Sequence, residues 1–94
     1  MVKAIWNGAT LAESDACVVL EGNHYFPPDS VHHQYLKETA THTTCVWKGE
    51  ASYYDIVVGD AVNVDAAWYY TSPLERAKNI AGYIAFWKGV SIED

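Results

Sequence analysis

Basic residues and long apolar runs are scarce in this sequence, and each scarcity excludes a class of protein. Six Lys and Arg residues stand against twelve Asp and Glu residues, which leaves a formal net charge of −6 at pH 7. A protein that binds nucleic acid needs a basic stripe to contact phosphates, so nucleic acid is not an expected partner. No apolar run approaches the roughly 20 residues of a membrane-spanning helix, so no membrane association is expected either.

Cysteine is also rare. Cys17 and Cys45 are too few for a disulfide framework and form no C-x-x-C pair. Residues 1–6 lack the charged and apolar regions of a signal peptide, so we expect reduced thiols and a cytoplasmic location. A structural zinc site needs a second pair of ligands beside His42-x-x-Cys45, and the sequence offers none. We therefore expect no metal and no other cofactor.

Aromatic residues, by contrast, are abundant. The 94 residues include four Trp, seven Tyr and two Phe, and half of the chain is hydrophobic. This length and composition predict a single domain over residues 1–94 with a core of its own. Each aromatic ring can bury about 150–250 Å², so most rings are expected in the core. The alternative for some of them is the wall of a ligand pocket.

Glycine-containing pairs divide the chain into short segments that predict an antiparallel β fold. Two-residue turns are expected at Asn7-Gly8, Gly22-Asn23 and Gly59-Asp60. A short helix is expected from residue 29 or 30 to 37, and a second one from the capping-box sequence at 72–75 to Gly82. Strands are expected over residues 2–6, 9–13, 16–21, 24–26, 51–58, 61–70 and 83–87. The predicted fold class is mainly β, with one or two short helices.

Three blocks of the sequence carry a family resemblance: Tyr25-Phe26-Pro27, the stretch from Thr44 to Tyr54, and the stretch from Asp65 to Tyr70 with Pro73, Ala77, Ile80, Gly82 and Ala85-Phe86. In this order they resemble domain-of-unknown-function family 427, which is sometimes labelled nucleotidyltransferase-like. The resemblance covers nearly the whole chain and implies a small β-rich fold similar to the Mss4-like or β-tent architecture, here without zinc knuckles. Val46 departs from the family pattern, because the family usually has proline at the position after the cysteine that is Cys45 here. The nucleotidyltransferase label finds no support, since paired aspartates after Gly-Ser and a P-loop are both missing.

Two residues inside these blocks are candidates for catalysis. Cys45 lies three residues from both His42 and Lys48, and a nearby base or cation would lower its thiol pKa and make it a nucleophile. The alternative is a small buried hydrophobic side chain. Asp65 is a candidate general base among aromatic rings, and the alternative is a carboxylate that accepts hydrogen bonds in the core. Counting from the turn at Gly59-Asp60 predicts that Tyr54 lies opposite Asp65.

The concentration of rings in these blocks predicts an aromatic-lined pocket for a small molecule, and the ammonium of Lys48 suits an anionic one. A small enzyme that uses Cys45 as nucleophile or redox thiol is one alternative. Another is a protein-interaction module, including a weak homo-oligomer. The residues predicted to contact the ligand are Tyr25, Trp47, Lys48, Tyr54, Asp65, Trp68 and Tyr70.

Overall fold

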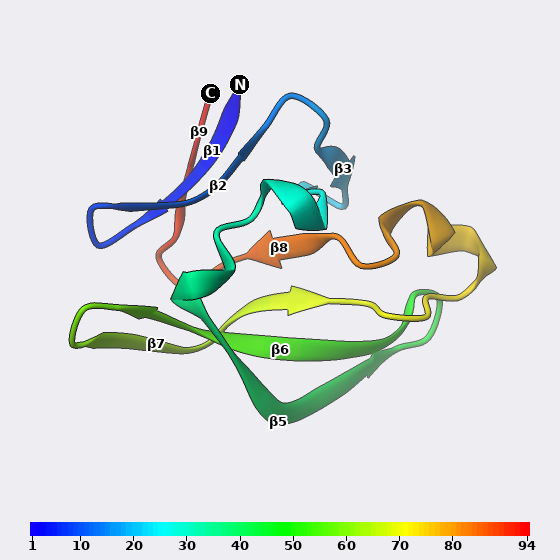
Figure 1. Ribbon diagram of the computed structural model, residues 1–94. Helices are drawn as coiled ribbons and strands as arrows, with labels where there is room; N and C mark the ends of the chain where they lie inside the picture. Colours follow the sequence, from blue (N-terminus) through cyan, green and yellow to red (C-terminus); the bar gives the residue numbers. More distant parts are fainter.

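The computed structural model describes all of residues 1–94 and is mainly β, as predicted (Figure 1). Its strands form three antiparallel sheets, and its helical segments are three short 3₁₀ turns. No helix is long and apolar enough to cross a membrane. The first sheet, in the order β2-β1-β9, contains β1 (Val2–Trp6), β2 (Ala9–Ser14) and β9 (Ser91–Glu93). The second sheet is the hairpin of β3 (Val18–Leu20) and β4 (Asn23–Tyr25). The third sheet, in the order β5-β6-β7-β8, contains β5 (Leu36–Cys45), β6 (Gly49–Val58), β7 (Ala61–Tyr69) and β8 (Ile84–Phe86).

Two hairpin turns have the left-handed backbone that a two-residue turn requires. Asn7 and Gly8 have φ values of 52° and 79° and join β1 to β2 as predicted. The β3–β4 turn lies one residue earlier than predicted, at Glu21 (φ 53°) and Gly22 (φ 78°). Type I′ turns favour glycine at their second central position, which Glu21-Gly22 provides and Gly22-Asn23 does not.

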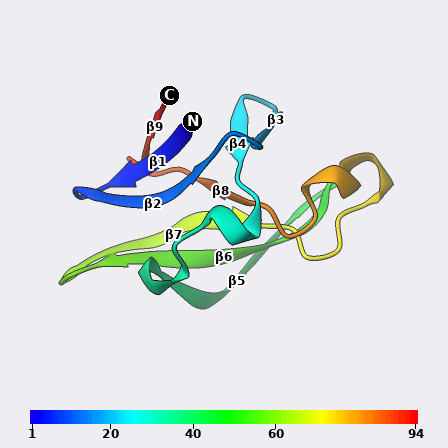
Figure 2. The same cartoon turned by 45° about the horizontal axis from the view of Figure 1, so that its top comes forward.

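The third sheet carries core residues on both of its faces. Because successive side chains of a strand point to opposite faces, Tyr54 and Ile56 of β6 face one side and Ala51 and Tyr53 face the other. The first sheet packs against one side, as Figure 2 shows. The core cluster between these two sheets consists of Ala4, Leu11, Ala12, Phe26, Val31, Ile56, Ala66, Ala67, Ile84 and Phe86.

A second, smaller cluster occupies the other side of the third sheet. It contains Tyr25 from β4 and two residues, Ala77 and Ile80, from the turn η3 (Glu75–Ile80). The remaining members are Ala51, Tyr70 and Ala85. The β3–β4 hairpin and η3 therefore meet over the face that carries Tyr53 and Trp68.

Both predicted helices are wrong in type. In place of the helix expected from residue 29 or 30 to 37, the chain forms two 3₁₀ turns, η1 (Pro28–Ser30) and η2 (His33–Tyr35), and then enters β5. Between the turns, Val31 forms a bridge with Ala12 and the amide of His32 donates to the Leu11 carbonyl at 2.7 Å. These tertiary contacts pull the chain into an extended conformation and prevent a continuous helix.

The segment expected to be a capped helix from residue 72 is the 3₁₀ turn η3, which begins only at Glu75 and has no side-chain cap. Its two buried residues, Ala77 and Ile80, are three positions apart. A 3₁₀ helix has three residues per turn, so this spacing aligns both side chains on the second core cluster.

The register of β6 and β7 changes along the hairpin. Near the Gly59-Asp60 turn, Val58 pairs with Ala61 and Ile56 with Asn63, as counting from the turn predicts. Beyond this point β7 has two more residues than β6, and Tyr54 pairs with Ala67. The predicted pairing of Tyr54 with Asp65 is therefore wrong. Asp65 lies in a bulge with a left-handed φ of 52°.

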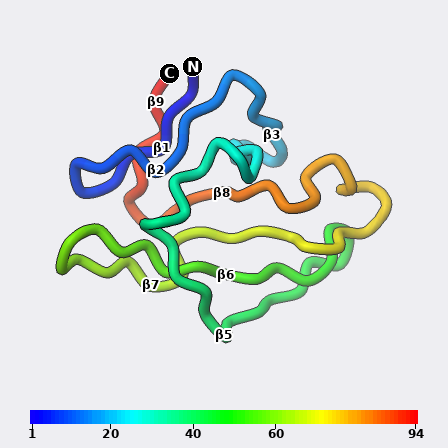
Figure 3. Tube along the Cα trace, viewed as in Figure 1, coloured from blue at the N-terminus to red at the C-terminus, as the bar shows by residue number.

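The C-terminal residues form a strand that the sequence pattern did not reveal. Lys3, Ala4 and Ile5 of β1 pair with β9, so the two chain ends lie side by side (Figure 3). The terminal amine also contacts the carboxylates of Asp15 at 3.3 Å and Asp94 at 3.5 Å. Residues 91–94 are exposed, but strand pairing and the Asp94 ion pair join them to the rest of the fold.

Candidate ligand-binding site

A cavity of about 300 Å³ opens on the side of the third sheet that carries the second core cluster. Four of its six lining residues are aromatic, and the other two are an amide and an ammonium. The lining residues are Asn23, Lys48, Tyr53, Trp68, Tyr70 and Trp87. These residues come from the β3–β4 hairpin, from the third sheet with its β5–β6 turn, and from the segments directly after β7 and β8. The cavity therefore forms only in the assembled fold.

Trp68 is the best fixed of the aromatic walls. It pairs with Tyr53 across β6 and β7, which directs both rings to the same face. Its indole Nε1 donates to the Tyr25 hydroxyl at 3.2 Å, and its ring packs edge-on against Tyr25 and Trp87 with centroids 6.1 Å and 5.7 Å away. Tyr25 is fully buried behind this wall. The wall is thus held by both hydrogen bonding and packing.

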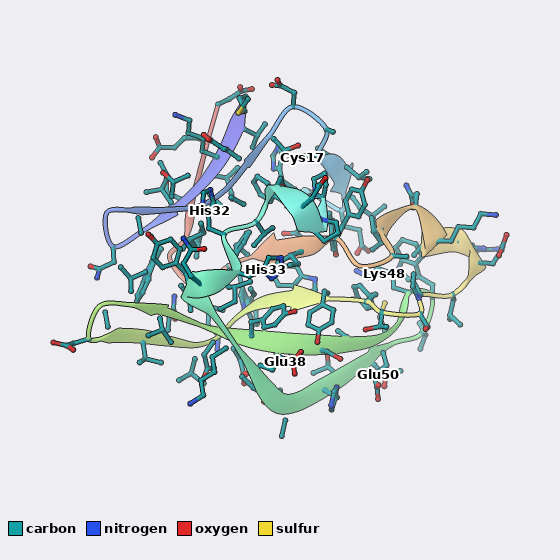
Figure 4. All side chains as sticks on the ribbon, in the orientation of Figure 1. Cys17, His32, His33, Glu38, Lys48 and Glu50 are labelled. Carbon is teal, nitrogen blue, oxygen red and sulfur yellow. The ribbon has the colours of Figure 1, made fainter.

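The turn between β5 and β6 brings Lys48 to the cavity. Cys45 and Gly49 form the closing pair of this turn, and Gly49 has a φ of 107°, which favours glycine. The carbonyl of Lys48 accepts a hydrogen bond of 2.9 Å from the amide of Leu74. Figure 4 shows Lys48 at this end of the third sheet, beside η3. The backbone on both sides of the lysine is therefore anchored.

Lys48 is the one charged residue that the fold buries, and its side chain is only 10% exposed. Its Nζ donates to Glu21 Oε1 and lies over the rings of Trp47 and Tyr70, at 5.4 Å and 5.6 Å from their centroids. Burial opposes the charge and lowers the pKa, but the hydrogen bond to Glu21, with contributions from the neighbouring Tyr25 and Tyr70, outweighs burial and raises the pKa of Lys48. Lys48 is consequently an ammonium at neutral pH.

The protonation states of Glu21 and Tyr70 are compatible with a positively charged Lys48. The hydrogen bond from Lys48 lowers the pKa of Glu21, whose side chain is 49% exposed at the tip of the β3–β4 hairpin. Burial raises the pKa of Tyr70, so its phenol stays protonated at neutral pH. The cavity thus combines a carboxylate–ammonium pair at its edge with neutral aromatic walls.

The structure brings some of the predicted ligand-contacting residues together. Lys48, Trp68 and Tyr70 line the cavity, and Tyr25 supports it from behind. Trp47 contacts the Lys48 ammonium and lines a second hollow of about 450 Å³ together with Val46, Leu74, Glu75 and Arg76.

Three lining residues were not singled out from the sequence. Tyr53 pairs with Trp68, but this pair could be predicted only if the strand register beyond the bulge were known. Asn23 comes from the β3–β4 hairpin and Trp87 follows β8, and no local pattern marks either of them as a neighbour of Lys48.

Tyr54 lies outside the cavity, on the other face of the third sheet. Its ring stacks on Tyr69 with centroids 4.7 Å apart, and both rings pack against the first core cluster. Burial, followed by the neighbouring Tyr69, raises the pKa of Tyr54 to about 12. Tyr54 is therefore a neutral core residue.

Asp65 also lies outside the cavity lining, and its polar groups are already bonded. Its two carboxylate oxygens accept hydrogen bonds of 2.9 Å from the hydroxyls of Thr39 and Thr41. Its amide donates to Asp55 Oδ1 at 2.9 Å, and its carbonyl accepts from Trp87 Nε1 at 2.6 Å. Asp65 thus matches the core alternative, and through Trp87 it positions one wall of the cavity.

The cysteines and histidines do not form a shared site. No hydrogen bond joins half-buried Cys45 to His42, whose ring contacts Ser52 Oγ at 3.1 Å. Burial, and then the charge of Asp15, raises the pKa of the Cys17 thiol. In Figure 4 Cys17 lies apart from His32 and His33. No three His, Cys, Asp or Glu side chains converge in a geometry suited to a metal ion.

Comparison with known proteins agrees with the resemblance seen in the sequence blocks. Residues 1–93 match the family described as Domain of unknown function (DUF427). No curated protein matches the chain. Since the match spans nearly the whole chain, the protein belongs to the DUF427 family.

Proposed function

We propose that this protein binds a small anionic molecule with a planar ring in the cavity beside Lys48. The observation that carries the proposal is the placement of a buried ammonium at an aromatic-lined cavity of about 300 Å³. Ligand sites are commonly built this way, with apolar and aromatic walls and a few polar groups that fix orientation.

The walls and the charge supply different parts of the affinity. A planar ring can pack against Trp68, Trp87 and Tyr53 by offset or edge-on contacts. An anionic group can accept a charge-assisted hydrogen bond from Lys48, which is stronger than a neutral one and stronger still where water is excluded. The amide of Asn23 offers a neutral hydrogen-bond donor and acceptor in the same cavity. The proposed ligand therefore needs both a ring and a negative charge.

Two further features are proposed with this function. A β-tent arrangement is supported by the first and third sheets, which pack over a shared core cluster. A cytoplasmic location is supported by the two free thiols, because the cytoplasm keeps cysteines reduced.

Use of Cys45 as a nucleophile has less support, since no base contacts it.

Benzoate, benzamide and acetate separate the contributions of ring and charge. In an NMR titration followed through indole N–H signals, benzoate should shift Trp68 and Trp87 but not Trp6, which packs at the first core cluster. Benzamide lacks the charge and acetate lacks the ring, so both should bind more weakly. Lys48→Met should weaken benzoate binding about tenfold or more, because a charge-assisted hydrogen bond contributes about 1.5–3 kcal/mol.

The control is Lys78→Met, which removes the same charge from a residue whose side chain is 71% exposed and lies outside the cavity. It should leave benzoate binding unchanged. Equal binding of benzoate and benzamide, or an unchanged affinity in Lys48→Met, would show that Lys48 does not recognise an anion here.

A further inference from the structure

The carboxylate of Glu21 already occupies the position from which an anion would contact Lys48. The Lys48 side chain is 10% exposed, its ammonium faces Trp47 and Tyr70, and its hydrogen bond goes to Glu21. An anionic group that enters the cavity therefore meets an ammonium that is already neutralised and almost completely covered.

We infer that Glu21 is an internal competitor for the anion site, and that ligand binding requires the tip of the β3–β4 hairpin to release Lys48. This inference rests on the proposed function, because it concerns the same lysine and the same cavity. The ligand's anionic group takes over the hydrogen bond from Nζ, and the Glu21 carboxylate moves into water.

The position of Glu21 in the chain makes such an exchange feasible. Glu21 lies in a two-residue turn, and its side chain is 49% exposed, so its carboxylate can be hydrated without unfolding the hairpin. The β3 and β4 strands have only three residues each, and isolated two-stranded hairpins are marginally stable.

The base of the hairpin, in contrast, is fixed. Tyr25 is fully buried and bonded to Trp68, and Phe26 pairs with Ile84 through two backbone hydrogen bonds of 2.8 Å and 2.9 Å. Local opening should therefore be confined to the tip, which is the least packed part of the hairpin.

The same tip also contributes a wall of the cavity. Asn23 lies two residues after Glu21 and is one of the residues that line the cavity. Movement of the turn consequently changes the charge available at Lys48 and the shape of the cavity together. A ligand without an anionic group does not compete with Glu21 and gains nothing from this movement.

Glu21→Gln tests the inference with benzoate as the probe and benzamide as its neutral counterpart. The variant should bind benzoate about tenfold more tightly than the wild type, the gain expected if Glu21 leaves Lys48 available about a tenth of the time. Benzamide affinity should not change. The amide signals of Gly22 and Asn23 in benzoate-saturated wild type should move toward their positions in ligand-free Glu21→Gln.

Two variants serve as controls. Glu13→Gln removes the same charge from an exposed position on β2 and should bind benzoate like the wild type. The double variant Glu21→Gln with Lys48→Met should lose the gain, because no ammonium remains to be released.

The outcomes separate the two proposals. If benzoate binds wild type and this binding depends on Lys48, but Glu21→Gln has wild-type affinity, the competitor role is overturned while the proposed function stands. If Glu21→Gln binds benzoate more weakly, Glu21 supports the site, and the inference is again overturned. If benzoate binds neither the wild type nor any of the variants, the proposed function fails together with the inference.

Discussion

At the scale of single residues, Asp65 shows how a polar side chain can shape a site without contacting a ligand. Its carboxylate holds Thr39 and Thr41 of β5, while its carbonyl holds the indole of Trp87. These bonds maintain a backbone with a φ of 52°, which non-glycine residues rarely adopt. Asp65 therefore determines the position of an aromatic wall through the conformation of β7.

Asp65→Ala should lower the free energy of unfolding by about 1–3 kcal/mol for the lost hydrogen bonds. Alanine in the left-handed region should cost about 1–2 kcal/mol more. Asp65→Asn keeps a side chain that tolerates this backbone and retains one acceptor oxygen, so it should be clearly less destabilising. Denaturant unfolding of both variants measures the difference.

The same pair of variants also tests the link to the cavity. In Asp65→Ala the indole N–H signal of Trp87 should shift strongly, and in Asp65→Asn it should stay near its wild-type position. Equal stability of the two variants would contradict the role of the left-handed bulge.

At the scale of elements, the β3–β4 hairpin is attached to the rest of the fold by both packing and charge. Tyr25 packs at its base and Glu21 pairs with Lys48 at its tip. The hydrogen bond from Lys48 lowers the pKa of Glu21 below its usual value near 4.5. A carboxyl group with a lowered folded-state pKa stabilises the fold above its unfolded pKa, and this contribution is lost as the pH falls through the folded-state pKa.

The thermal stability of Glu21→Gln should therefore differ from wild type in a pH-dependent way. At pH 7 the wild type should have the higher Tm, and the gap should narrow as the pH falls below about 4.5. Differential scanning calorimetry between pH 7 and pH 3 measures this gap. Glu13→Gln, which loses an exposed carboxylate on β2, should show no comparable trend. A constant gap across the range would show that the pair does not stabilise the folded state.

The elements predicted correctly are those that depend on local chemistry. The turn at Asn7-Gly8 follows from the left-handed conformation that both residues tolerate. The helices were predicted from local patterns too, but these segments form 3₁₀ turns. The contact from β2 to Val31 and the burial of Ala77 and Ile80 account for this difference. Segments this short gain little from helix propensity alone, so tertiary packing determines their form.

The candidate site was predictable to the extent that its residues follow one strand. Trp68 and Tyr70 were predicted as ligand contacts because they lie in the ring-rich block from Asp65 to Tyr70. Glu21 bonds to Lys48, and Asn23 and Trp87 line the same cavity, from distant parts of the chain. Their approach depends on how the hairpin and the end of β8 pack, which strand periodicity does not specify.

At the scale of the whole molecule, the two chain ends complete one sheet. β1 lies between β2 and β9, and Ala4 at its centre is fully buried in the first core cluster. Without β9, β1 would become an edge strand with unpaired backbone groups. The first sheet thus depends on residues that are the most distant from one another in the sequence.

Deletion of residues 91–94 should lower the free energy of unfolding by about 1–3 kcal/mol, because the hydrogen bonds between β1 and β9 are lost. For a domain of this size, the Tm should fall by at least about 4 °C. Amide exchange should accelerate in β1 but not in β7. Deletion of Asp94 alone removes an exposed ion pair with the terminal amine and should have little effect. A Tm loss of the same size in both deletions would assign the effect to charge rather than to strand pairing.

The bulge in β7 determines which deletions the β6–β7 pair should tolerate. Between the Ile56–Asn63 and Tyr54–Ala67 pairs, β7 exceeds β6 by two residues, which is an even number. Even parity keeps the inward and outward alternation in phase on both sides of the bulge, so Tyr53 and Trp68 still share a face. Loss of two residues would remove the bulge and keep this phase, so the pairing of Tyr53 with Trp68 should survive such a deletion. Loss of one residue would leave a bulge of one extra residue, which β2 already forms opposite Ala4 and Ile5, so this change should also be tolerated.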